Sequence, residues 1–150
     1  MATIKDIMTP GCKWISPEAS IADAAKLMRD DDVGFLPVGE NDRLIGTLTD
    51  RDIVTRVVAS RRDATEISVR DAMSKKLLYC FDDQDVDAIT QNMAAMQVRR
   101  LPVVNRAKRL VGTVSFADLA RAATPTTYTN AQKQIAAKPV KIGIRAANIA

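Results

Sequence analysis

Two stretches of the chain place apolar residues at helical spacing. In the first stretch the positions i, i+3, i+4 and i+7 are occupied by Ile21, Ala24, Ala25 and Met28. In the second stretch the positions i, i+3 and i+7 are occupied by Val86, Ile89 and Met93. Residues at this spacing share one face of an α-helix, which can pack against a core. Ser20 and Asp85 directly precede the two stripes, and both residue types are favoured helix N-caps. The pattern predicts two equivalent amphipathic helices.

Short apolar runs flank both predicted helices. We expect strands at residues 14–15, 35–38 and 44–48 in the first half of the chain and at residues 77–81, 101–104 and 110–114 in the second. A polar loop separates the last two runs of each half, as in a hairpin. A second helix is expected after each hairpin, at residues 53–58 and 116–122. Each half therefore has the element order β-α-β-β-α.

The two halves are also copies of each other in sequence. Residues 4–8 match residues 69–73, and the Leu-Pro-Val of residues 36–38 recurs at 101–103, both at an offset of 65 residues. From Leu44 onward the offset is 66, because the second copy has one more residue in its polar loop. Self-similarity of this kind identifies a tandem duplication.

We expect an α/β (α+β) fold of two packed repeats, because a unit of about 55 residues can scarcely bury its own apolar faces. The first repeat is expected at residues 3–59 and the second at 69–122, with the polar residues 60–68 as a linker. Residues 123–150 contain many alanines, scattered cations and no acid. They are predicted to form a basic, poorly ordered tail, with one helical turn near residues 131–137.

The positive charge of the chain is concentrated in its C-terminal part. The formal net charge is +4, but residues 121–150 alone carry five cations and no acid. Residues 1–120 are therefore close to neutral and give no electrostatic reason to expect a nucleic-acid groove. No apolar run approaches the ~20 residues that a membrane helix needs, and residues 1–14 lack the apolar core of a signal peptide. We expect a cytoplasmic protein without a membrane partner.

The composition argues against catalysis and against a metal centre. The chain has no histidine for acid–base work or for metal binding. Cys12 and Cys80 have no metal-ligand spacing, and we expect them to be reduced thiols. Neither has a histidine partner that could activate it as a nucleophile. The acidic run at residues 30–32 is expected to be a solvated helix end.

One motif occurs in both repeats, where the hairpin leads into the second helix. Its pattern is Gly-x-h-[Thr/Ser]-x-x-Asp, with h apolar, at residues 46–52 and 112–118. In a structural interpretation the hydroxyl residue is an N-cap and the carboxylate completes a near-copy of the capping box. In a functional interpretation the helix N-terminus and the hydroxyl bind phosphate, while the carboxylate accepts hydrogen bonds from ribose hydroxyls. The residues alone leave both interpretations open.

Taken together, these features resemble the CBS domain family. The resemblance rests on the element order, the Asp-x-Met lead-in at residues 6–8 and 71–73, the two Leu-Pro-Val segments and the doubled motif, and it covers about residues 3–122. It implies two repeats related by pseudo-twofold symmetry, with two equivalent clefts between them. It also implies an adenosine-containing ligand, such as AMP, ADP, ATP, NAD or S-adenosylmethionine. Family members commonly form homodimers through their helices, for which the apolar positions among residues 53–58 are suited.

The resemblance also assigns roles to the motif residues. Thr49 and Asp52 would bind phosphate and ribose in one cleft, and Ser115 and Asp118 would do so in the other. In the family the base-side contacts usually come from the opposite repeat. In the cleft of Thr49 these contacts would come from residues 74–76 and Val98. In the cleft of Ser115 they would come from residues 11–13, the last of which is Lys13, and from Val33 and Gly34.

Two adjacent arginines are candidates for direct phosphate binding. Arg99 and Arg100 stand just before the Leu-Pro-Val strand of the second repeat, and the planar donor fork of arginine suits a phosphate. A solvated pair at a strand entrance is the alternative. The first repeat has Gly34 and Phe35 at the corresponding positions, so the two clefts are expected to differ in ligand or in occupancy.

These observations predict a regulatory module and no enzymatic activity. The module would sense an adenine nucleotide in signal transduction and act, as a homodimer, on an unknown partner protein. The alternative is a structural or interaction module whose clefts bind no ligand. It would act through dimerisation and through its basic tail, which could dock an acidic partner or nucleic acid.

Overall fold

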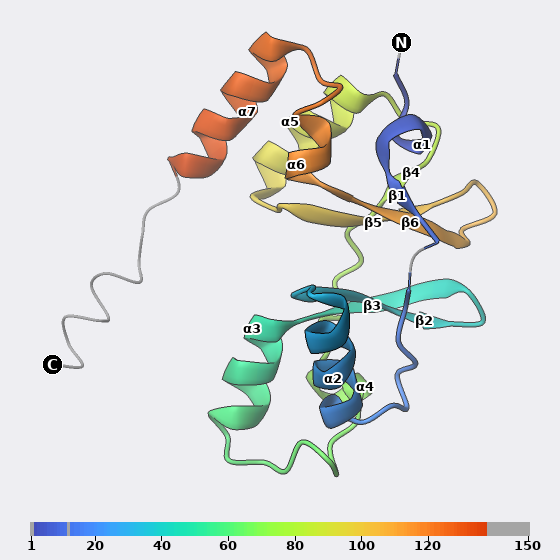
Figure 1. The fold of residues 1–150 in the computed structure, drawn as a ribbon, viewed down its shortest axis with the longest axis vertical. Coiled ribbons are helices and arrows are strands. Elements are labelled where there is room, and N and C mark those ends of the chain that lie inside the picture. Colours follow the sequence, from blue (N-terminus) through green and yellow to red (C-terminus); the bar gives the residue numbers. More distant parts are fainter. Residues whose placement is uncertain (1, 12, 138–150) are drawn as a thin grey trace, which may run out of the picture.

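The computed structural model describes residues 2–11 and 13–137 of the 150-residue chain. In the first half the elements are α2 (Ile21–Asp31), β2 (Phe35–Glu40), β3 (Arg43–Thr49), α3 (Asp50–Ile53) and its π-helical continuation η1 (Val54–Val58). The second half contains β4 (Cys80–Phe81), α5 (Val86–Met96), β5 (Arg100–Val104), β6 (Leu110–Ser115) and α6 (Phe116–Leu119). The predicted helices and hairpins are present, although α6 ends at Leu119 instead of residue 122 and α3 begins at Asp50 instead of residue 53. The two halves lie one above the other (Figure 1).

The two amphipathic helices begin where the sequence predicts. Ser20 caps α2 by accepting a hydrogen bond from the amide of Asp23 at 3.0 Å, and Asp85 caps α5 by accepting one from the amide of Ala88 at 3.1 Å. The stripe residue Met93 is fully buried. A side-chain oxygen at the N-cap satisfies an amide that has no partner within the helix, which is why helices start there.

The predicted first strands of the repeats are shorter than expected. Residues 14–15 form no strand, and Ile15 makes an isolated parallel bridge to Val38. In the second repeat only Cys80 and Phe81, of the expected residues 77–81, pair with β5. The edge position explains the difference, because each segment has a single neighbouring strand that can fix its backbone.

The lead-in segments of the repeats are exchanged in space. Helix α1 (Ile4–Ile7) and strand β1 (Thr9–Pro10) belong to the first repeat in sequence, but β1 pairs with β6 of the second, giving the sheet order β1-β6-β5-β4. Ser74, which follows α4 (Val69–Ala72), bridges in the same way to Thr47 of the first repeat. The amide of each of these two residues donates to the carbonyl of the other, at 2.8 and 3.0 Å. Each repeat therefore completes the sheet of its partner repeat.

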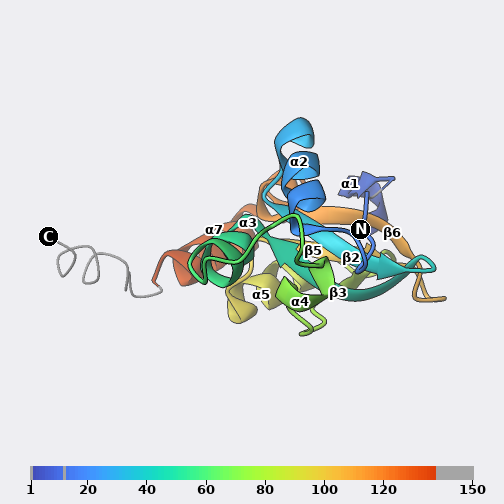
Figure 2. The same cartoon turned by 90° about the horizontal axis from the view of Figure 1, so that it is seen from below.

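The exchange also joins the two hydrophobic cores. Ile4 is fully buried in the core that the second repeat forms. Val69 and Met73 are buried in the core of the first repeat. Figure 2 shows α1 and α2 on one side of the sheets and α4 and α5 on the other, as a pseudo-twofold relation requires. The expectation that the two copies pack on each other is confirmed, because neither core is complete without the lead-in of the other repeat.

The expected linker takes part in this packing. Ile67, which lies within residues 60–68, is 5% exposed and belongs to the core of the first repeat. The two hairpin tips also touch. The amide of Leu110 donates to the carbonyl of Asp42 at 2.9 Å, and Nη1 of Arg109 donates to the carbonyl of Asn41 at 2.6 Å. The repeats are thus in direct contact through their hairpin tips.

The prediction of a poorly ordered tail is wrong for its first part. Residues 125–136 form helix α7 (Pro125–Ala136), which packs against α5 and buries Ala131 and Ile135. Thr124 caps the helix by accepting from the amide of Thr127, and Pro125 occupies its first position, where a missing N–H costs nothing. The composition suggested disorder because the apolar contacts of this helix are provided by α5. Residues 138–150 lie outside the described residues.

None of the helices in the described part of the chain is long and apolar enough to cross a membrane.

Candidate functional site

The motif of the first repeat forms a complete capping box at the start of α3. The hydroxyl of Thr49 accepts a hydrogen bond from the amide of Asp52 at 3.1 Å, and Oδ2 of Asp52 accepts one from the amide of Thr49 at 2.9 Å. Oδ1 of Asp52 lies 3.8 Å from Nη2 of Arg56. The hydroxyl of Thr49 uses only its acceptor side in this bond, so its O–H can still donate to a ligand.

The motif of the second repeat has the same geometry at the start of α6. Ser115 accepts from the amide of Asp118 at 3.1 Å, and Oδ2 of Asp118 accepts from the amide of Ser115 at 2.8 Å. Oδ1 of Asp118 accepts from Nη2 of Arg121 at 2.7 Å. The structural interpretation of the motif therefore holds in both copies, and it leaves the functional interpretation open.

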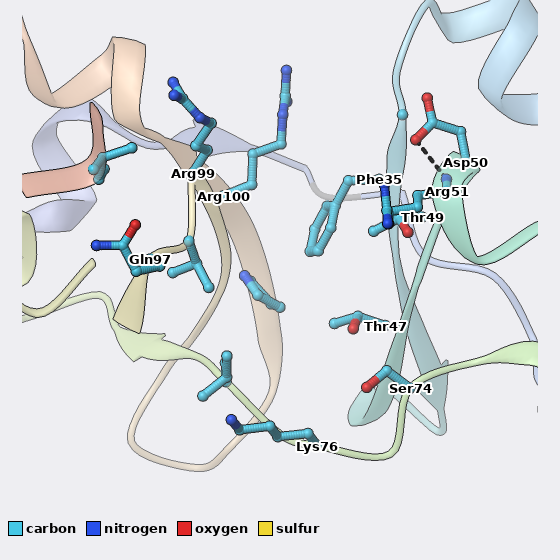
Figure 3. Close-up of a pocket in the computed structure, with 15 residues that line it drawn as sticks. Phe35, Thr47, Thr49, Asp50, Arg51, Ser74, Lys76, Gln97, Arg99 and Arg100 are labelled. Atoms are coloured by element: carbon cyan, nitrogen blue, oxygen red, sulfur yellow. Dashed lines mark hydrogen bonds between the residues drawn. The ribbon is translucent and has the colours of Figure 1, made fainter. Parts of the chain in front are cut away.

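A large cleft lies between the two repeats, beside Thr49. Its volume is about 770 Å³. It is lined by Gly34, Phe35, Thr47, Thr49, Asp50, Arg51, Ser74, Lys76, Leu78, Gln97, Val98, Arg99, Arg100, Pro102 and Ile135. In Figure 3, Gln97, Arg99 and Arg100 lie on one side of the cleft, Thr49 and Arg51 lie across from them, and Ser74 and Lys76 lie at one end. We call this space the larger cleft.

The larger cleft brings together residues that the sequence assigns to one site. Thr49 comes from the first repeat, whereas Val98, Arg99 and Arg100 come from the second, and all four line it. Ser74 and Lys76 of the expected segment 74–76 join them. Asp52 is absent from the lining residues, because its carboxylate is turned toward the amide of Thr49.

A second cleft occupies the pseudo-symmetric position. Its volume is about 320 Å³, and we call it the smaller cleft. It is lined by Thr9, Pro10, Gly11, Lys13, Asp31, Val33, Phe35, Leu36, Pro37, Arg100 and Thr113. Lys13 and Val33 lie where the sequence predicts, and Nζ of Lys13 forms an ion pair with Asp31 at 3.0 Å. Ser115 and Asp118 line neither this cleft nor the larger one. Cys12 lies outside the described residues.

Gly34 lies in the other cleft from the one predicted. It was expected beside Val33 in the cleft of Ser115, but it lines the larger cleft. A Cβ atom at Gly34 would meet Oδ2 of Asp50 at 2.8 Å, and the carbonyl of Gly34 accepts from the amide of Asp50 at 3.0 Å. The local backbone therefore turns Gly34 toward α3 of its own repeat.

Sequence reasoning missed eight residues of the larger cleft: Phe35, Thr47, Asp50, Arg51, Leu78, Gln97, Pro102 and Ile135. Arg51 occupies a variable position of the motif, and Phe35, the counterpart of Arg100, lines both clefts as Arg100 does. Ile135 comes from α7, and Gln97 is the left-handed C-cap residue of α5. Nε2 of Gln97 donates to the carbonyl of Gln134 at 3.0 Å, which ties α7 to the cleft wall. The Thr124-Pro125 start signal and the i, i+4 pair Ala131 and Ile135 could have revealed the helix, but not its position.

The fold and the two clefts define a paired-repeat binding module, and comparison with known proteins gives its family. The family model for the CBS domain matches residues 4–59 and 69–124, and the chain belongs to the CBS domain family. The CBS domain-containing protein YhcV of Bacillus subtilis is 41% identical over 120 residues, which are 80% of this chain and 84% of YhcV. Hypoxic response protein 1 of Mycobacterium tuberculosis is 37% identical over 122 residues, which are 81% of this chain and 85% of that protein.

Two solved structures extend the comparison to ligands. The crystal structure of Hypoxic Response Protein I with two coordinated zinc ions has a TM-score of 0.72 and covers 81% of this chain and 98% of that chain. The crystal structure of CBSX2 in complex with AMP has a TM-score of 0.71 at 27% identity, and covers 81% of this chain and 96% of that one. Among the described residues here, no group of three or more histidine, cysteine or acidic side chains could hold a metal ion.

Proposed function

We propose that this chain is a regulatory module that senses an adenine nucleotide, such as AMP, ADP, ATP or an NAD-like ligand, in the larger cleft and catalyses no reaction. Ligand binding would bridge the two repeats and shift their relative packing, because a ligand favours the arrangement to which it binds more tightly. The effect would pass to a partner protein.

One observation carries this proposal: the larger cleft joins phosphate-binding groups from both repeats at a helix start. The Thr49 hydroxyl stands on one wall, and the guanidinium groups of Arg99 and Arg100 stand on the other. Val98 and Leu78 add apolar surface, against which a base could pack. Apolar walls with a few convergent polar groups are typical of small-molecule sites. The solved complex of the related CBSX2 with AMP supports the choice of an adenine ligand.

The motif carboxylates would then have a structural as well as a binding role. Asp52 holds Thr49 in position through the capping box, and its remaining lone pairs are available to ribose hydroxyls. A ribose that used them would have to reach past Thr49, because Asp52 is not on the cleft wall. Asp118 holds Ser115 in the same way, but neither residue lines a cleft.

The test is isothermal titration of ligand-free protein with AMP, ATP, NAD and S-adenosylmethionine, using two matched variants. Thr49→Ala and Ser115→Ala each remove one N-cap and should each cost about 1 kcal/mol of stability. Only Thr49 lines the larger cleft. We expect Thr49→Ala to weaken binding about tenfold or more, while Ser115→Ala binds as the parent does. If the parent and both variants bind the ligand equally well, the motif is only a helix cap.

A second candidate function is an interaction module whose clefts bind no ligand. It is favoured by the complete capping boxes, which satisfy Thr49, Asp52, Ser115 and Asp118 without a nucleotide. In that case no adenine ligand would bind to the parent protein. Retention on RNA or DNA that is lost when residues 138–150 are removed would support this alternative.

We further propose that the chain forms a homodimer through α3 and η1. Val54 and Val58 are 58% and 62% exposed and lie one turn apart on the same helical segment. Val57, on the opposite face, is buried in the core of the first repeat. A second copy is the occupant that the common homodimers of this family favour.

A further inference from the structure

The larger cleft is lined by more cations than the smaller one, in which Lys13 and Arg100 are the cationic lining residues. Four cations line the larger cleft: Arg51, Lys76, Arg99 and Arg100. At the corresponding positions of the other repeat the sequence has Ala117, Gly11, Gly34 and Phe35. The two repeats therefore differ in charge at four equivalent positions. The two repeats therefore share their fold, and the clefts differ in the ligand chemistry that their charges suit.

The four cations are not neutralised by the protein. Within residues 2–11 and 13–137, none of the four side chains forms an ion pair with a carboxylate. Asp50 is the one acid on the cleft wall, and its Oδ1 accepts from the amide of Arg51 at 2.8 Å. In the smaller cleft, by contrast, Lys13 is paired with Asp31 at 3.0 Å. The larger cleft thus has an excess of three positive charges.

The positions of these charges favour an extended anion. Arg51 extends from the start of α3, whereas Arg99 and Arg100 come from the opposite wall and Lys76 lies at one end of the cleft (Figure 3). A chain of two or three phosphates offers anionic oxygens to more of these side chains, on both walls, than a single phosphate group does. It would also relieve the mutual repulsion of the cations. The volume of about 770 Å³ leaves room for a nucleoside beside such a chain.

We propose that the larger cleft selects nucleotides with a di- or triphosphate chain over nucleoside monophosphates, and that the phosphate chain is held by cations of both repeats. This inference rests on the proposed function and adds the ligand class to it. Each guanidinium presents a planar fork of donors that matches phosphate oxygens, so each added contact strengthens binding measurably. We expect ATP to bind at least about tenfold more tightly than AMP. The difference should shrink as salt is added, because the contacts are electrostatic.

The inference is tested by titrating ligand-free protein with adenosine, AMP, ADP and ATP, at low and at high salt and without divalent cations. Arg51→Ala and Arg99→Gly replace each arginine by the residue at the equivalent position of the other repeat. Lys75→Gln is the matched control, because Lys75 is an exposed neighbour of Lys76 that does not line the cleft. Thermal shift of each free variant shows whether it is folded.

We expect the parent and Lys75→Gln to bind ATP more tightly than AMP. In Arg51→Ala and Arg99→Gly the ratio of the two affinities should fall toward one, while the affinity for adenosine stays unchanged. Equal affinity of the parent for AMP and ATP would overturn the inference and leave the proposed function standing. A preference that survives both arginine substitutions would also overturn it. Absence of binding by every ligand would instead contradict the proposed function itself.

Discussion

Gly112 and Thr9 are in direct backbone contact across the two repeats: a Cβ atom at position 112 would lie 2.5 Å from the carbonyl oxygen of Thr9. The same relation holds in the other repeat, where a Cβ at Gly46 would lie 2.7 Å from the carbonyl oxygen of Ser74. The glycine of the repeated motif is thus explained by the exchanged lead-in segment, which pairs with the strand that carries the glycine. A side chain there would force the two backbones apart.

Gly112→Ala and Gly46→Ala should each lower the free energy of unfolding by about 1–3 kcal/mol, as overpacking does in other proteins. Urea denaturation measures the effect. Gly39→Ala is the control, because its Cβ would meet side-chain atoms of Trp14 and Leu110 at 3.0–3.2 Å, which can shift. An equal loss in all three variants would show that close backbone approach is not the cause.

Helix α7 should contribute to stability as well as to the cleft wall. Ile135 is 9% exposed and packs at the edge of the second core, so Ile135→Ala should destabilise the protein by about 2 kcal/mol. Lys133→Ala, on the exposed side of the same helix, should change stability by less than about 0.5 kcal/mol. The comparison is made by chemical denaturation. Equal stability of parent and Ile135→Ala would mean that α7 does not pack on α5 in solution.

The thiol of Cys80 should be unreactive in the folded protein. Cys80 is 2% exposed, and burial, with a smaller effect of the Asp82 charge, raises the pKa of its thiol from 9.0 to about 12. In a Cys12→Ser variant, a thiol reagent at pH 8 should therefore label Cys80 only after urea is added. Rapid labelling of the native protein would contradict the buried position.

The same raised pKa has a consequence for stability at high pH. Between pH 9 and about 12 the unfolded chain loses a proton from Cys80 that the native chain keeps, so this group makes folding less favourable as pH rises. The loss of stability on going to high pH should be greater in Cys12→Ser than in Cys12→Ser/Cys80→Ala, since only the first variant has the Cys80 thiol. Denaturation midpoints at pH 8 and pH 10 compare the two. Parallel changes in both variants would argue against the raised pKa.

Dimerisation should depend on the exposed valines of η1. Val58→Asp places a charge at the centre of the proposed interface and should convert the dimer to a monomer, as measured by sedimentation. Arg62→Asp, an exposed position beyond the end of η1, is the control for charge alone. If the parent protein sediments as a monomer, the chain forms no such dimer. If Val58→Asp is still a dimer, the interface lies elsewhere.

Much of the fold could be predicted from local patterns along the chain. The stripes beginning at Ile21 and Val86 predicted α2 and α5, and the caps Ser20 and Asp85 predicted where they start. The doubled Leu-Pro-Val predicted the paired hairpins. These signals are local, because helix caps and strand periodicity depend on neighbouring residues alone. The site was predicted in part: Thr49, Val98, Arg99 and Arg100 do line one cleft.

The tertiary structure alone decided which segments meet. Three features depend on contacts between residues far apart in the sequence. Strand β1 completes the sheet of the second repeat, Gly34 turns to the larger cleft, and Ile135 forms part of the wall of that cleft. No periodicity encodes them. The amide of Thr9 can bond equally well to any strand edge, and Ile135 can bury its side chain against any apolar face. The choice follows from how two incomplete cores close on each other, which is settled only when both repeats are in place.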